Sequence, residues 1–246
     1  MVTPCLFAFR DDLMQRNQLF YKTLDSTFME LERLHSMTPR SSFVIRASSQ
    51  TSGIGRKQNF WASPEGGLWY SFDLRYSGAV ESFALYVGVC VHKVLIELFQ
   101  SHMQATRIKW PNDIYFSNRK LAGILTRYYH SRNLYLIGLG MNVNNQIIKD
   151  RDLSAISLQE ILGEEISLNW LSNAIMDKVT SSTDDLKDPR SYLSYCEENL
   201  YGLGRRCCVE QGETRIEGRI KGLGRSGNLV LEDEQELSYG SLSILE

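Results

Sequence analysis

Several features that define common protein classes are missing from this chain of 246 residues. Lysine and arginine number 27 against 29 acidic residues, so the chain lacks the basic excess that proteins binding nucleic-acid duplexes usually show. No stretch approaches about 18 uninterrupted apolar residues, the length that crosses a bilayer. Residues 1–12 lack the basic segment and long apolar core of a signal peptide, and we interpret their short apolar run as a strand. We therefore expect no nucleic-acid partner and no membrane partner.

Cysteine and histidine are also sparse. The five cysteines form no CxxC pair and no Cys/His pair with zinc-ligand spacing, and their odd number is typical of reduced thiols. The four histidines are scattered and indicate neither a metal site nor a catalytic triad. Reduced thiols without a targeting segment predict a cytoplasmic location.

The residues that are present are those of an ordinary globular protein. Hydrophobic residues make up 43% and charged residues 23%, enough to bury a sizeable core. Strand and helix patterns do not alternate regularly, which argues against a doubly wound sheet. We predict an α+β fold with a mixed, largely antiparallel sheet backed by helices in residues 1–201. Short strands between glycine-containing turns predict a small β-barrel in residues 202–246, which should lean on the first domain.

The expected elements follow from periodicity and turn signals. A helix should begin at Asp25 or Ser26, with Thr27 and Glu30 at capping-box spacing. Further strands and helices are expected along the chain, with a hairpin turn at 130–133. The strands are 42–48, 68–76, 106–110, 113–117, 120–129 and 134–144; the helices are 79–100, 157–163 and about 168–200.

The "KWPND" segment, residues 109–113, is unusual at a strand end. The tripeptide Pro-Asn-Asp alone predicts only a turn, because proline removes a backbone donor and both polar residues favour turns. Lys109 and Lys120, on either side of the next hairpin, would place two cations beside Asn112 and Asp113. Such a group indicates a phosphate or carboxylate site, with Asp113 able to hold Mg²⁺.

A second candidate segment is the loop "SGIGRKQNFWASPEGG", residues 52–67. Its glycines can expose backbone N–H groups to an anion, and Arg56 can pair with phosphate in fork geometry. The pattern is neither GxGxxG nor a P-loop, so the signal is weak by itself. Trp61 could stack on a base, close an apolar pocket or simply pack in the core.

Taken together, the motifs resemble the catalytic domain of biotin protein ligases. The shared motifs are GxGRxxxxWxSPEGGL, KWPND, RKLAGIL and GLGMNVN, and the resemblance runs from about Asp25 to Leu162. It implies a class II synthetase/biotin–lipoate ligase-like fold, with an SH3-like domain at the C-terminal end. The chain has no room before residue 25 for the DNA-binding domain of some members, so a monofunctional ligase is expected.

The resemblance implies that biotin and ATP form biotinyl-5′-adenylate, and that biotin then passes to a lysine of a biotin carboxyl carrier domain. ATP, biotin and Mg²⁺ are the expected small molecules, and Arg56 and Lys120 the expected catalytic residues. The implied biotin contacts are Ser26, Thr27, Gln50, Gly53, Ile54, Gly55, Arg56, Lys120 and Gly123. The implied nucleotide contacts are Arg56, Trp61, Lys109, Asn112, Asp113 and Asn142, with Asp113 as the metal anchor.

The chain departs from the family pattern in its glycine loop. Ile54 and Asn59 stand where arginines are usual, although Lys57 can compensate, and Phe28 stands where a polar residue is common. One alternative is a lipoate–protein ligase, which shares the fold and the adenylate chemistry but whose characteristic loop is absent here. The other is a non-catalytic biotin- or adenylate-binding regulator, which the two missing arginines would favour. An exposed sheet edge would allow a homodimer or docking of the acceptor.

Overall fold

The computed structural model describes residues 16–147 and 154–245. The strand predicted in residues 1–12 lies outside the described residues. The strands of the first sheet are β1 (Asn17–Leu24), β2 (Phe43–Gln50), β3 (Leu68–Arg75), β4 (Thr106–Lys109), β5 (Asp113–Phe116), β6 (Arg119–Tyr129) and β7 (Leu134–Met141). The helices are α1 (Thr27–Met37), α2 (Phe83–Phe99), α3 (Leu158–Leu162), α4 (Leu168–Ser181) and α5 (Arg190–Glu198). Short 3₁₀ turns are η2 (Arg56–Gln58), η3 (Gln100–Met103), η4 (His130–Arg132) and η5 (Thr183–Lys187).

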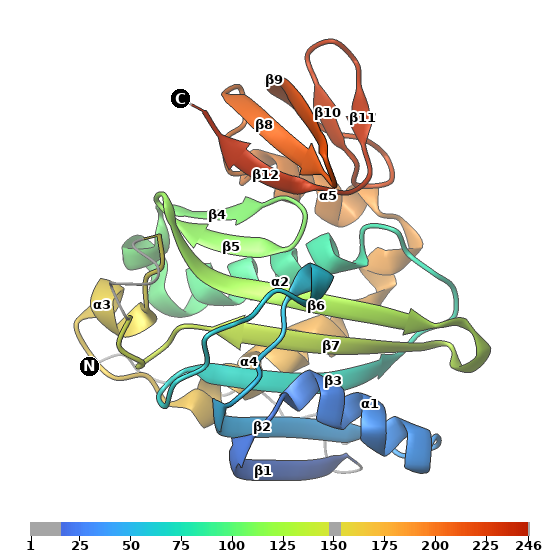
Figure 1. The fold of residues 1–246 in the computed structure, drawn as a ribbon, viewed down its shortest axis with the longest axis vertical. Coiled ribbons are helices and arrows are strands. Elements are labelled where there is room, and N and C mark those ends of the chain that lie inside the picture. Colours follow the sequence, from blue (N-terminus) through green and yellow to red (C-terminus); the bar gives the residue numbers. More distant parts are fainter. Residues whose placement is uncertain (1–15, 148–153, 246) are drawn as a thin grey trace.

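The first sheet has seven strands in the order β1-β2-β3-β7-β6-β5-β4. Strand β1 runs parallel to β2, and the other neighbours are antiparallel. Helices α2 and α4 cover one face of the sheet, whereas α1 lies on the opposite face over β2, β3 and β7 (Figure 1). The sheet therefore confirms the predicted mixed, largely antiparallel architecture backed by helices.

Helix α1 begins one residue earlier than a Thr27–Glu30 capping box requires. The N-cap is Ser26, whose Oγ accepts from Met29 N at 3.4 Å. The backbone N–H of Thr27 instead donates to Gln50 Oε1 at 2.8 Å, and Glu30 accepts from Arg33. The predicted helix start is confirmed, but the capping-box pairing is wrong because Gln50 satisfies the Thr27 N–H.

Helix α2 forms the centre of the main core. Most of its side chains are buried against the sheet and against α4. By length and composition alone, Phe83–Met103 could cross a membrane, with a mean hydropathy of 1.5. Because 61% of that window is buried within the fold, its apolar character is explained by the core it fills.

Strand β1 was not predicted from the sequence. It is an edge strand whose side chains are mostly exposed or half-buried, and Phe20 is 61% exposed. A strand with little buried surface carries a weak alternating pattern, and its register depends on pairing with β2 far along the chain (Asn17 with Phe43).

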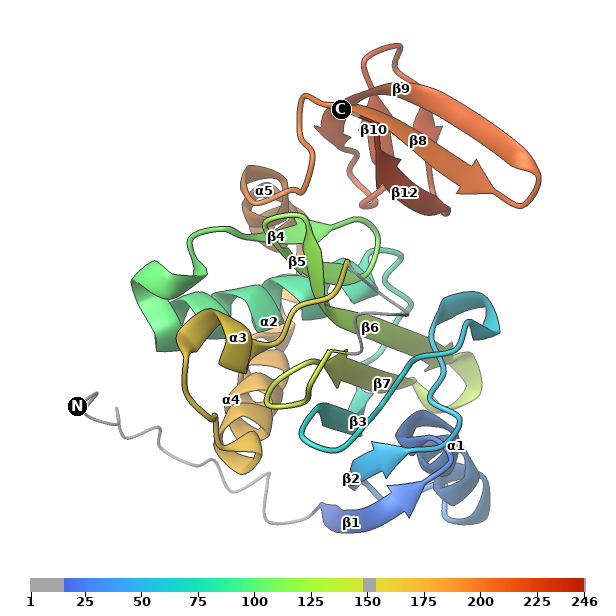
Figure 2. The same cartoon turned by 60° about the vertical axis from the view of Figure 1, so that its left-hand side comes forward.

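The C-terminal segment forms a second sheet of five antiparallel strands in the order β11-β10-β9-β8-β12. These are β8 (Arg206–Gln211), β9 (Thr214–Leu223), β10 (Leu229–Leu231), β11 (Glu236–Leu237) and β12 (Ser241–Ile244). The sheet stands at the β4–β5 end of the first sheet, next to α5 (Figures 1 and 2). Its buried apolar side chains join the cluster built around α2, so the two sheets share one core. Residues 202–246 as a separate domain stay a prediction.

Candidate active site

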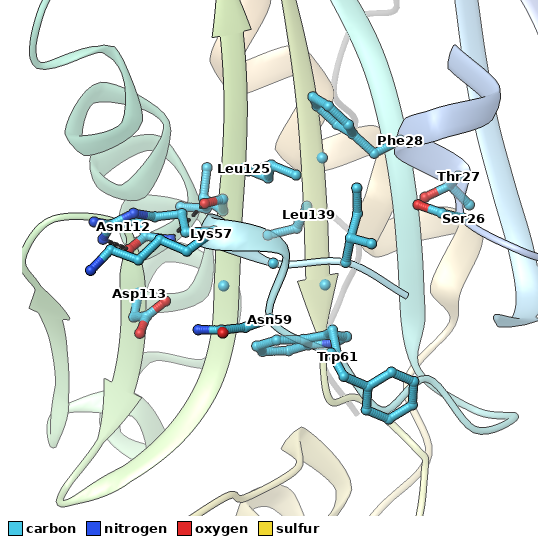
Figure 3. Close-up of a pocket in the computed structure, with 18 of the residues that line it drawn as sticks. Ser26, Thr27, Phe28, Lys57, Asn59, Trp61, Asn112, Asp113, Leu125 and Leu139 are labelled. Atoms are coloured by element: carbon cyan, nitrogen blue, oxygen red, sulfur yellow. Dashed lines mark hydrogen bonds between the residues drawn. The ribbon is translucent and has the colours of Figure 1, made fainter. Parts of the chain in front are cut away.

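A cavity of about 330 Å³ opens on the face of the first sheet that carries α1. It lies between the start of α1, the β2–β3 loop and strands β5, β6 and β7. Figure 3 shows side chains from these elements around the cavity. The described lining residues are Ser26, Thr27, Phe28, Gln50, Ile54, Gly55, Arg56, Lys57, Asn59, Phe60, Trp61, Ser71, Asn112, Asp113, Lys120, Gly123, Ile124, Leu125, Gly138, Leu139, Gly140 and Ser241.

Glycines on two neighbouring strands make the floor of the cavity flat. Gly123 on β6 pairs with Gly140 on β7. Gly138, two residues before Gly140, lies on the same face of β7. A Cβ at Gly140 would stand 2.7 Å from Trp61 Nε1, and one at Gly138 would stand 2.9 Å from Phe28 Cδ2. The bare backbone therefore lets two aromatic rings lie directly on the strands.

The charged end of the cavity is built by the β5–β6 hairpin. Asp113 pairs with Gly123 across the hairpin, and a bulge after Ile114 brings Lys120 alongside. Lys120 Nζ lies 2.7 Å from Asp113 Oδ2 and 4.8 Å from the centre of the Trp61 ring. The structure thus brings together Lys120, Asn112 and Asp113, as the spacing predicted.

Two polar atoms at this end are buried without a hydrogen-bond partner in the described part of the chain. They are Asp113 Oδ1 and Trp61 Nε1. Buried polar atoms are nearly always paired in folded proteins, so an unpaired acceptor and donor facing one cavity indicate that a ligand completes them.

The glycine-containing loop folds as a short hairpin over the sheet. Gly55 N donates to Asn59 O at 2.8 Å, Trp61 N donates to Gly53 O at 2.8 Å, and Ile54 bridges to Phe60. Ile54 therefore lies at a backbone bridge and lines the cavity without adding charge.

Arg56 connects this hairpin to two other parts of the protein. Its Nη1 donates to Asn112 Oδ1 at 2.8 Å, and its Nη2 donates to the carbonyl oxygen of Gly240 at 2.9 Å. Burial lowers the pKa of the Arg56 guanidinium, and the charge of Asp113 opposes this shift. Arg56 is held by neutral acceptors, which leaves its charge available to an anion in the cavity.

The opposite end of the cavity is polar and uncharged. Ser71 Oγ donates to Thr27 Oγ1 at 2.9 Å, and Thr27 Oγ1 donates to Gln50 Oε1 at 3.1 Å. Gln50 Nε2 donates to Ser63 Oγ at 2.7 Å. This chain runs from the sheet, through the start of α1, to the end of the β2–β3 loop (Figure 3 labels Ser26 and Thr27). A chain of mutually ordered hydroxyl and amide groups is suited to a neutral ring with hydrogen-bonding groups.

Three residues predicted for the site do not line the cavity. Lys109 Nζ donates to Tyr115 Oη at 2.9 Å, and burial lowers its pKa although Asp113 opposes the shift. Asn142 Oδ1 accepts from Asn145 Nδ2 at 3.0 Å. Gly53 lies within the loop against its other arm, where a Cβ would stand 2.4 Å from Trp61 O. Their roles toward nucleotide or biotin stay predictions.

Several lining residues were not identified from the sequence. The alternation Gly138-Leu139-Gly140 did carry a signal, because glycines two apart clear one face of a strand. Ser71 and Leu125 look like ordinary strand residues, and nothing local marks Ser241, which reaches the cavity from the second sheet.

Comparison with known proteins adds three findings. The model of the "Biotin/lipoate A/B protein ligase family" matches residues 20–144. The bifunctional ligase/repressor BirA of Bacillus subtilis is 29% identical over 247 residues, covering 93% of this chain and 73% of that protein. Biotin–protein ligase 2 of Arabidopsis thaliana is 35% identical over 237 residues, covering 88% of this chain and 69% of that protein.

A solved structure agrees with these sequence matches. The biotin protein ligase from Aquifex aeolicus in complex with biotin and ATP superposes with a TM-score of 0.77 at 27% identity. The match covers 93% of this chain and 98% of that one. It therefore extends beyond the family model and includes the second sheet.

Proposed function

We propose that this chain, which belongs to the biotin/lipoate A/B protein ligase family, is an ATP-dependent biotin–protein ligase. The observation that carries the proposal is the cavity itself. A neutral hydrogen-bonding end at Thr27 and Gln50 is joined to a cationic end at Arg56 and Lys120. This arrangement fits an acid with a neutral polar ring whose carboxylate must meet a phosphate.

The first step joins two anions. A carboxylate oxygen of biotin attacks the α-phosphorus of ATP, the bond to the β-phosphate oxygen breaks, and pyrophosphate leaves with the bonding electrons. Arg56 and Lys120 neutralise the charge that this approach concentrates, and rigid strands hold Lys120 in place. No nucleophile of the chain itself is required.

In the second step the amine of an acceptor lysine attacks the carbonyl carbon of biotinyl-5′-adenylate, and AMP leaves. Before transfer, the mixed anhydride must be kept from water. The indole of Trp61 lies on Gly123 and Gly140 and closes the cavity from the loop side, which restricts water at the intermediate.

Mg²⁺ is part of the proposal. The buried, unpaired Oδ1 of Asp113 fits one carboxylate ligand of a cation that otherwise binds substrate phosphates. Among the described residues no group of three His, Cys, Asp or Glu side chains could hold a metal, and Mg²⁺ usually takes its other ligands from substrate phosphates and water. Such a cation would neutralise the departing pyrophosphate.

The acceptor is proposed to be a biotin carboxyl carrier protein or domain, in the cytoplasm. Within residues 16–147 and 154–245, β1 is an edge strand that pairs with β2 alone, and its outer edge offers backbone groups for docking this acceptor or for a homodimer.

The test is a biotin-dependent release of pyrophosphate from ATP, followed by mass spectrometry of a biotin carboxyl carrier domain. Lipoic acid is run in parallel. Release with biotin and biotinylation of one acceptor lysine are expected. Transfer of lipoyl but not biotinyl groups would make the chain a lipoate ligase. Tight biotin binding without pyrophosphate release would make it a regulator that binds without catalysis.

A further inference from the structure

A corner of the second sheet, residues 239–241, reaches the charged end of the cavity. The carbonyl oxygen of Gly240 accepts from Arg56 Nη2 at 2.9 Å, and Ser241 lines the cavity. The contact joins residues 184 positions apart, so it exists only because the second sheet is docked on the first.

The corner is held rigidly. Gly240 has a φ of +148°, and a Cβ there would stand 2.4 Å from Val209 Cγ1. Strand β12 continues from Ser241, which pairs with Glu210 of β8, and Gln211 Nε2 donates to Tyr239 O at 2.6 Å. These contacts tie the corner to β8, so Arg56 donates to a backbone carbonyl that belongs to the second sheet.

A second hydrogen bond ties the "KWPND" hairpin to the same sheet. Trp110 is 2% exposed, and its Nε1 donates to the carbonyl oxygen of Gly227 at 3.0 Å. Asn112, two residues on, is the other acceptor for Arg56. The second sheet therefore contacts both the "KWPND" hairpin, through Trp110, and Arg56, through Gly240.

The hydrogen-bond donors near Gly240 and Ser241 that have no protein acceptor among the described residues are suited to binding an anion. Of the five N–H groups of Arg56, two are used by Asn112 and Gly240, which leaves three. The exposed hydroxyl of Ser241 makes no hydrogen bond within the described ranges, 16–147 and 154–245, and Lys57 also lines the cavity. The polar, uncharged groups for biotin lie at the other end.

We propose that the Gly240–Ser241 corner forms part of the nucleotide-phosphate site: the Gly240 carbonyl positions Arg56, and the Ser241 hydroxyl donates to a phosphate oxygen of ATP. The inference rests on the proposed function, because it names a further contact of the same site. It assigns a binding role to the second sheet, beyond its contribution to the shared core.

The test uses the full chain and the α,β-methylene analogue of ATP, which cannot be cleaved at the α–β bridge. Its dissociation constant is measured by calorimetry with saturating biotin. Ser241→Ala should raise it roughly tenfold by losing one hydrogen bond to a charged group. Ser241→Asp should raise it at least about tenfold, because a carboxylate would face phosphate and compete for Arg56. The dissociation constant for biotin should stay unchanged in both variants.

The matched controls are Ser243→Ala and Ser243→Asp, two residues along the same strand. Ser243 does not line the cavity, and its Oγ donates to Cys208 O at 3.2 Å. Analogue binding should be unchanged in both controls, and thermal melts check folding of all four variants. Equal analogue affinity of Ser241→Asp and Ser243→Asp would overturn the inference.

Wild-type pyrophosphate release separates this result from the proposed function. One outcome is that the wild type binds the analogue, Ser241→Asp weakens this binding, and the wild type releases no pyrophosphate from ATP. That outcome would support the phosphate contact of Ser241 and refute the proposed ligase activity. If the wild type binds no analogue, the phosphate site is refuted.

Discussion

Replacing Lys120 with methionine removes the ammonium group from the charged end of the cavity while keeping an unbranched side chain of similar length. Lys120 Nζ lies 2.7 Å from Asp113 Oδ2, and the two side chains are 24% and 16% exposed. They are shielded enough from water for the charge to act strongly on a ligand, yet open enough to be reached by one.

The expected loss follows from the charge that is removed. Deleting one preorganised donor at developing negative charge lowers rates by about 10²–10³, or about 2.7–4 kcal/mol of transition-state stabilisation. The variant also leaves the Asp113 carboxylate without its cation, and Asp113 Oδ1 already lacks a partner among the described residues. Because the variant loses both the donor and the cation that pairs with Asp113, we expect the upper part of that range.

The assay is the initial rate of biotin-dependent pyrophosphate release at saturating biotin and ATP. Lys120→Arg keeps the charge but changes its geometry, and should fall between wild type and Lys120→Met. Arg119→Met is the matched control, because Arg119 is adjacent in sequence but pairs with Glu160 outside the cavity at 2.5 Å. Near-normal release by a folded Lys120→Met variant would remove Lys120 from the mechanism.

Three further changes test other parts of the structure. Arg56→Gly removes the link between loop and hairpin, so biotinyl-adenylate should escape and label an unrelated protein such as serum albumin; labelling of the acceptor alone would contradict this role. Gly140→Ala places a Cβ 2.7 Å from Trp61 Nε1 and should lower adenylation about tenfold by lifting the indole, whereas Gly88→Ala, with 3.6 Å to its nearest neighbours, should have no effect. Burial lowers the pKa of His92 from its ordinary value of 6.5, so the unfolded chain binds more protons below that pH. The free energy of unfolding should therefore fall as pH drops below 6.5, and His92→Gln should flatten that decline in denaturant titrations; an unchanged slope would refute it.

Much of the fold could be predicted because local pattern and tertiary position agree. The start of α1 at Ser26 follows from a capping residue before an apolar stripe, and the β5–β6 hairpin follows from its turn residues. Strand β1 could not be predicted, because its backbone is ordered by pairing with β2 rather than by its own exposed side chains.

The site residues also fall into those whose position could be predicted from the sequence and those whose position could not. Asp113 and Lys120 could be placed together because a hairpin converts sequence spacing into proximity. Lys109 belongs to the same motif, yet it turns toward Tyr115 and does not line the cavity. Its motif membership did not indicate which way the side chain points.

By itself, the sequence determined the chemistry: an arginine, two lysines and a carboxylate carried by a glycine loop and a hairpin, in spacings that resemble one enzyme family. Only the tertiary structure decided how these segments meet. Arg56 is held between Asn112 and the Gly240 carbonyl, and Ser241 enters the cavity from the far end of the chain. Short-range motifs encode the hairpin because its groups lie within a few residues of one another. The contact to Gly240 depends on the packing of two sheets through a shared core, which no local pattern expresses.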